Sequence, residues 1–187
     1  MLVFDSNRSK GDPMESRVKL LGHPIHPMLI VLPLGLLSAA LVFDIVYLAT
    51  GDAAFAEVAF WNITLGVLGG LLAALFGVID WLAIPWETRA KRIGLIHGIG
   101  NVVVVGLFLV SWFLRLPNHA YLPAVLPFVP GLVAVILALG TAWLGGELVY
   151  RLRVGVDRNA SLNTPSSLSG DPGMGRRESG ETADAAG

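Results

Sequence analysis

The chain alternates between polar segments and long apolar segments. Residues 1–22 and 157–187 are polar at most positions, and four apolar segments lie between them, at about 27–48, 60–82, 93–114 and 122–148. A transmembrane helix needs roughly 20 apolar residues to cross a hydrocarbon core of about 30 Å. The pattern therefore predicts an all-α membrane protein with a bundle of four transmembrane helices.

The polar ends predict the limits of the membrane domain. We expect a polar N-terminal segment over 1–22 and a transmembrane domain over 23–155. Residues 156–187 are rich in Ser, Gly, Asp and Arg and cannot bury enough apolar surface to offset the entropy of ordering, which predicts a disordered tail. The first apolar segment is too long for a signal peptide and follows a long polar segment, so we expect it to be an uncleaved first span.

Positive charge is distributed unevenly among the segments that connect the predicted spans. Twelve Lys and Arg residues precede the first span, connect the second and third, or follow the fourth. One, Arg115, falls in the connection between the third and fourth. Because cytoplasmic connections carry an excess of Lys and Arg, this distribution predicts that both termini are cytoplasmic.

The composition excludes several classes of function. Hydrophobic residues make up 54% of the chain and charged residues 14%, against about 25% charged residues in a soluble domain. The lipid bilayer is therefore the expected environment. A net charge of −1 gives no bulk attraction for nucleic acid. The absence of cysteine excludes disulfides, thiolate zinc sites and Cys-ligated iron–sulfur clusters.

Five ionisable residues lie in or beside the apolar segments near the predicted cytoplasmic end: His23, His26, Asp80, His97 and Glu147. Ionisable groups at membrane depth are costly, so each is a functional candidate. Neutral imidazole binds zinc, copper and haem iron, and carboxylates complete such sites or orient the rings. The set predicts a metal site of three histidines with Asp80 or Glu147, or a haem with His26 and His97 as axial ligands.

Local spacing adds geometry to this hypothesis. His23 and His26 each precede a proline, which disfavours the helical conformation. In an extended path with a repeat of about three residues, their rings would project in the same direction. Asn101 follows His97 by one helical turn and shares its face.

Structural roles are the alternative for the same residues. A histidine before a proline can be an interfacial residue at a helix start. Asp80 and Glu147 can pair with basic residues at helix ends, namely Arg89, Arg92 or Arg151. At the opposite end, we expect Asp44 to form a buried hydrogen bond with the start of the second span, where Asn62 and Thr64 lie. An outer gate or ion site is the alternative there.

Several motifs resemble the DUF2231 family of predicted bacterial membrane proteins. They are Gly-His-Pro-Ile-His-Pro-Met-Leu at 22–29, Leu-Pro-Leu-Gly at 32–35, Gly-Val-Ile-Asp-Trp at 77–81, and Arg92 followed by His97. The resemblance covers about residues 20–155. It implies a four-span domain of unassigned function in the bacterial cytoplasmic (inner) membrane. It also implies His23, His26, Asp80 and His97 as the residues to test.

The family is distantly similar to four-helix b-type cytochrome modules, and some relatives are joined to Rieske-type iron–sulfur domains. The resemblance therefore implies redox work in the membrane. Because this chain has no cysteine, any Rieske partner would be a separate protein.

We therefore expect a membrane redox or metal-binding module with a histidine-rich site, holding a b-type haem or a transition-metal ion. Asp80 and Glu147 would support the ligands. One alternative is a small proton- or cation-coupled transporter or channel, with Asp44 and Asn62 toward the outside. The other is a non-catalytic assembly subunit whose small-residue helix faces bind a membrane partner.

Overall fold

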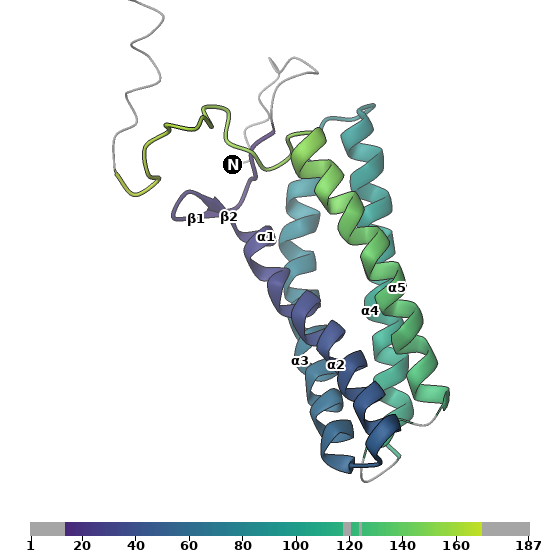
Figure 1. The fold of residues 1–187 in the computed structure, drawn as a ribbon. Coiled ribbons are helices and arrows are strands. Elements are labelled where there is room, and N and C mark those ends of the chain that lie inside the picture. Colours follow the sequence, from purple (N-terminus) through teal and green to yellow (C-terminus); the bar gives the residue numbers. More distant parts are fainter. Residues whose placement is uncertain (1–13, 118–120, 124, 170–187) are drawn as a thin grey trace, which may run out of the picture.

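The computed structural model describes residues 14–117, 121–123 and 125–169. Figure 1 shows an elongated antiparallel bundle of four long helices. They are α2 (Val31–Thr50), α3 (Ala53–Ala83), α4 (Arg89–Arg115) and α5 (Val125–Gly146). A short helix, α1 (Ile25–Leu29), leads into α2, and a π-helical turn, η1 (Glu147–Arg151), follows α5. All four spans are long and apolar enough to cross a membrane, which confirms the predicted architecture.

The connection between α2 and α3 is much shorter than the sequence pattern predicts. Gly51 ends α2 with a positive φ of 73°, which glycine adopts without steric cost. Asp52 then accepts a hydrogen bond from the backbone N–H of Ala54, at 3.0 Å, and caps α3. The helix consequently begins at Ala53 rather than near residue 60.

The core lies between two helical hairpins. The α2 helix packs along α3, and α4 packs along α5. Small and large apolar side chains from all four helices meet at the centre; they are Leu37, Ala40, Ala59, Ile63, Val67, Val104, Phe108 and Ala134. Large apolar side chains such as Val102 and Leu139, 69% and 68% exposed, cover the outer surface. Such a surface suits lipid contact.

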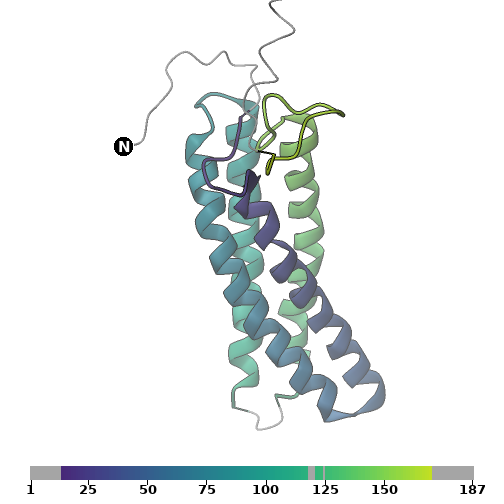
Figure 2. The same ribbon diagram turned by 90° about the vertical axis from the view of Figure 1, so that its left-hand side faces the viewer.

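The described N-terminal and C-terminal segments meet at one end of the bundle (Figures 1 and 2). Met14 forms a parallel bridge with Val154. Next to it, β1 (Lys19–Leu20) and β2 (His23–Pro24) form a small antiparallel hairpin. We call this the terminal end, and we call the other end, where Gly51 and Leu116 lie, the distal end.

Parts of the predicted polar ends are therefore ordered. Met14 and Ser16 are buried, although both belong to the predicted N-terminal polar segment. Residues 156–169 form turns and irregular structure. The rest of the predicted tail, and residues 1–13, lie outside the described residues.

Candidate functional site

His26 connects the first turn of α1 to the middle of α3. Its Nδ1 lies 2.8 Å from the backbone oxygen of Ala73. The ring covers Gly77, where an added Cβ would lie 2.9 Å from the imidazole Cε1. The extended conformation predicted for His26 is wrong, because Pro27 lies in the first turn of a helix, where its missing N–H is tolerated.

His23 does not share the environment of His26. It lies in β2, its side chain is exposed, and its Nδ1 lies 3.2 Å from the backbone oxygen of Leu21. The two rings therefore have different backbone partners on different elements.

His97 connects α4 to α5 in a similar way. Its Nδ1 lies 2.8 Å from the backbone oxygen of Thr141. The ring covers Gly145, where an added Cβ would lie 3.2 Å from Cε1. Asn101, on the same helix face, has its amide nitrogen 3.2 Å from Nε2 of His97. The Thr141 hydroxyl donates to the Asn101 amide oxygen at 3.1 Å.

These contacts determine the tautomer of both histidines. A backbone carbonyl only accepts hydrogen bonds, so Nδ1 carries the proton in each neutral ring and Nε2 keeps its lone pair. Histidines that bind metals are commonly oriented by such an N–H to carbonyl bond. The His26 and His97 rings are also close enough for a charge on one to act on the other.

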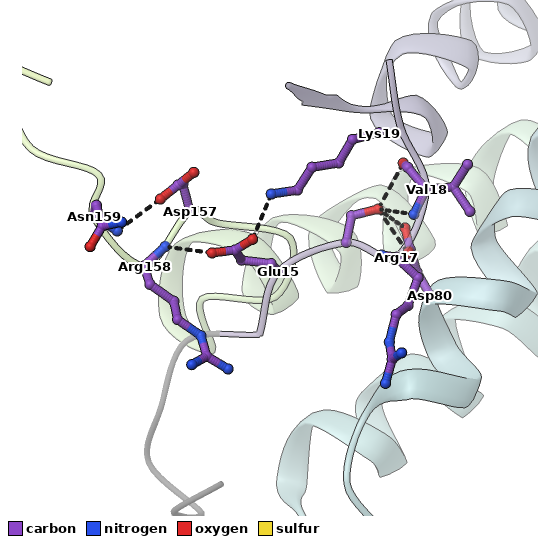
Figure 3. A network of polar contacts seen from close by, with 9 residues as sticks. Glu15, Arg17, Val18, Lys19, Asp80, Asp157, Arg158 and Asn159 are labelled. Carbon is purple, nitrogen blue, oxygen red and sulfur yellow. Dashed lines mark hydrogen bonds and ion pairs between the residues drawn. The ribbon is translucent and has the colours of Figure 1, made fainter. Parts of the chain in front are cut away.

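Asp80 binds the N-terminal segment rather than a histidine (Figure 3). Its two carboxylate oxygens accept the Ser16 hydroxyl at 2.7 and 2.8 Å, and one accepts the backbone N–H of Arg17 at 2.8 Å. These bonds connect the end of α3 to the segment that leads into β1. Asp80 therefore has a structural role, with partners that differ from the arginines expected.

Glu147 pairs with arginine, as the structural alternative predicts. Its carboxylate lies 2.7 Å from the guanidinium of Arg89 and 4.0 Å from that of Arg151. Within the described ranges of the chain, no three His, Cys, Asp or Glu side chains gather as an ion site would require. The structure thus does not bring the five predicted ligands together, and the two docked histidines remain the candidate ligands.

A buried ion pair occupies the distal end. Arg115 donates to both carboxylate oxygens of Asp44, at 2.8 and 2.5 Å, and the two residues are 0% and 2% exposed. Arg115 also donates to the Ser111 hydroxyl at 3.3 Å, and Ser111 donates to the backbone oxygen of Pro127 at 2.6 Å. Charge counting assigned Arg115 to a loop, whereas it lies in the last turn of α4.

The expected partners of Asp44 lie elsewhere. Asn62 lines a shallow groove on α3 with Trp61 and Leu65. Thr64 accepts a hydrogen bond from the indole N–H of Trp112 at 2.8 Å. The predicted hydrogen bond between Asp44 and the start of the second span is therefore wrong, because Arg115 occupies both carboxylate oxygens.

Sequence reasoning also missed the environment of Lys91. Its ammonium donates to the backbone oxygen of Trp81 at 2.8 Å and lies 4.0 Å from the Trp81 ring centroid and 4.5 Å from that of Trp86. Cation–π contacts of this kind are attractive. They hold the turn between α3 and α4, and tryptophans close to a lysine in the sequence are the only signal that could have indicated them.

A family model described as a predicted membrane protein (DUF2231) matches residues 22–158. The chain belongs to the DUF2231 family. No curated protein and no solved structure matches the chain. The matched range of the DUF2231 domain contains His26, His97, Asp44 and Arg115.

The two ends of this DUF2231 domain differ in what they can do chemically. At the distal end, the carboxylate and the guanidinium neutralise each other. At the terminal end, two neutral imidazoles are oriented by their Nδ1 atoms and retain Nε2 as a donor of an electron pair. Metal coordination is the chemistry that such rings perform.

Proposed function

We propose that this DUF2231 domain is a membrane module that binds a metal cofactor through His26 and His97. The observation that carries the proposal is the bond from each Nδ1 to a backbone carbonyl on a neighbouring helix, at 2.8 Å in both cases. Each bond fixes the ring and leaves Nε2 free to coordinate.

The donor set favours a b-type haem over an isolated transition-metal ion. A zinc-like ion needs three or four protein ligands, and no such group occurs among the residues that the structure describes. Haem iron already has four porphyrin nitrogens and needs only two axial ligands, which two histidines can supply. When bound, the haem would supply one-electron transfer.

Asn101 and Thr141 would adjust the His97 side of the site. The Asn101 amide lies 3.2 Å from Nε2 of His97, so it would have to turn away for coordination. It would keep a partner, because it also donates to the backbone oxygen of His97 at 2.9 Å. Thr141 would continue to hold the amide oxygen of Asn101.

The proposed orientation puts this site near the cytoplasmic face of a bacterial inner membrane. With Arg115 buried against Asp44, the distal connections at 51–52 and 116–124 contain no Lys or Arg, against twelve in the segments at the other end. The positive-inside rule then favours a cytoplasmic terminal end. A redox partner would be a separate protein that reaches the site from that face.

Transport is the weaker candidate. A polar path needs accessible groups at both ends, and Asp44 is fully occupied by Arg115 while Asn62 lies on the outer face of α3. The cofactor proposal needs only the residues of the terminal end.

The test is an absorbance spectrum with haem and metal analysis of the full chain purified from haem-replete cells. We expect a Soret band and a sharp reduced α band, both lost in His26→Ala and in His97→Ala. The exposed His23 provides the matched control, because His23→Ala should retain the spectrum. Protein without haem absorbance and without stoichiometric metal would contradict the proposal. Stoichiometric metal without haem would keep the histidine site and replace the cofactor.

A further inference from the structure

The two histidine contacts have the same construction. In each, Nδ1 lies 2.8 Å from a backbone carbonyl, and the ring covers a glycine four residues further along the same helix. The residues are His26, Ala73 and Gly77 in one contact and His97, Thr141 and Gly145 in the other.

The spacing of these residues along the chain is also regular. A shift of 71 residues relates α1 and α2 to α4, and a shift of 68 residues relates α3 to α5. The first shift converts His26 to His97 and Asp44 to Arg115. The second converts Ala73 to Thr141 and Gly77 to Gly145.

Sequence identity and burial follow the same two shifts. Identical residues include the pairs Ile25 and Ile96, Val31 and Val102, Gly35 and Gly106, Leu36 and Leu107, Phe60 and Phe128, Val67 and Val135, Leu71 and Leu139, and Ala74 and Ala142. The buried residues of α5 are Pro127, Gly131, Ala134 and Thr141. Their counterparts in α3 are Ala59, Ile63, Gly66 and Ala73, and all four are buried. The two hairpins thus bury the same positions.

The directions of the helices fit a two-fold relation between the hairpins. Both α2 and α4 run from the terminal end to the distal end, and α3 and α5 return (Figures 1 and 2). Asp44 and Arg115 occupy equivalent positions and contact each other. Residues at equivalent positions touch where a two-fold axis passes between them, so the axis runs along the bundle through this ion pair.

We propose that the domain is a tandem repeat of two helical hairpins, and that His26 and His97 are equivalent halves of one site. Such a site takes a single flat ligand that is approached from both faces, which is the shape of a metalloporphyrin. The ligand class rests on the proposed function, whereas the repeat rests on the shifts, the burial and the shared construction. The halves differ mainly at Asn101 and Thr141, whose counterparts are Ile30 and Ala73.

The first test exchanges the distal ion pair and needs no cofactor. A two-fold relation converts each position into the other, so the double variant Asp44→Arg with Arg115→Asp should rebuild the bidentate pair. Ala40→Ser and Ser111→Ala are added, so that serine again lies one turn before the arginine. We expect each single charge reversal to prevent accumulation of folded protein, and the exchanged variant to recover most of the wild-type melting temperature in detergent. An exchanged variant as unstable as the single reversals would overturn the repeat.

The second test counts the ligand. Ferric haem b is titrated into the purified full chain in nanodiscs and followed by absorbance and electron paramagnetic resonance. We expect saturation at one haem per chain, with the low-spin signal lost equally in His26→Ala and His97→Ala. Saturation at two haems per chain, or a low-spin signal that survives in one variant, would overturn the shared site while leaving cofactor binding intact. A wild-type chain that binds no haem would overturn the proposed function and the shared ligand together, and the repeat would then be decided by the charge exchange.

Discussion

The two ends of the bundle bury polar groups in opposite ways. At the distal end, Asp44 and Arg115 satisfy each other inside the protein, and Ser111 extends the contact to a backbone carbonyl. At the terminal end, His26 and His97 each use one ring nitrogen for a carbonyl. Among the described residues, Nε2 of His26 has no hydrogen-bond partner, and Nε2 of His97 faces the Asn101 amide. Polar groups that are fully paired fix helix positions, whereas partly paired imidazoles remain able to bind a ligand.

The largest predicted effect is the loss of Arg115. Arg115→Ala leaves the Asp44 carboxylate buried without its partner, and removal of one member of a buried ion pair costs about 3–5 kcal/mol. Chemical unfolding in detergent measures the loss. The matched control is Lys19→Ala, because the pair of Lys19 with Glu15 is more exposed and such pairs contribute about 0–1 kcal/mol. Equal losses in the two variants would contradict the importance of the distal pair.

The next effect concerns the glycines beneath the histidine rings. Gly77→Ala places a methyl group 2.9 Å from the His26 ring, and overpacking of this kind costs about 1–3 kcal/mol. Gly145→Ala should cost less, because the corresponding distance to His97 is 3.2 Å. The control is Gly98→Ala, since an added Cβ there meets nothing within 4 Å. Thermal unfolding should rank the three variants in this order, and a Gly98→Ala loss as large as that of Gly77→Ala would refute the packing explanation.

Asp80 should control the terminal end locally. Asp80→Ala removes the acceptor of the Ser16 hydroxyl and of the Arg17 N–H, and hydrogen bonds to charged groups contribute about 1.5–3 kcal/mol each. We expect faster tryptic cleavage after Arg17 and Lys19, with little change in global unfolding. Asp80→Asn keeps one acceptor oxygen and should fall between the wild type and alanine. An unchanged cleavage rate in Asp80→Ala would show that other contacts hold the segment.

The smallest effect is the pH dependence of the N-terminal segment. The hydrogen bond from the Lys19 ammonium holds the pKa of Glu15 below its ordinary value of 4.5. A carboxyl whose pKa is lower in the folded state stabilises that state above its unfolded pKa and loses this contribution as the pH falls. Tryptic or hydrogen-exchange protection of residues 14–19 should therefore weaken as the pH falls below about 4.5. Glu15→Gln should remove this dependence, and protection that strengthens on acidification would contradict it.

Apolar segment length was sufficient to predict the four spans, and charge at a helix end was sufficient to suggest arginine partners for Glu147. Three features needed the structure. The Gly51–Asp52 turn permits helix where polar residues suggest a loop. The contact of His26 with α3 outweighs the extended preference of a residue before proline. The Asp44–Arg115 pair joins residues from different helices, and hydropathy alone assigns Arg115 to a connection.

The repeat was present in the sequence but needs two different shifts. A single shift of 71 residues aligns His26 with His97 but does not align Gly77 with Gly145, because the second connection differs in length from the first. Apolar helices also resemble one another by composition. The common burial of α3 and α5 positions is what separates a repeat from this background.

The most direct test of the account is nitrogen NMR of the histidine side chains in the full chain, held in nanodiscs at neutral pH without added cofactor. Single histidine substitutions assign the signals of His23, His26, His97 and His119. The account predicts that His26 and His97 are both neutral, with the proton on Nδ1 and an unprotonated Nε2. A proton on Nε2 of either ring would contradict it, because that nitrogen could then not serve as a metal ligand.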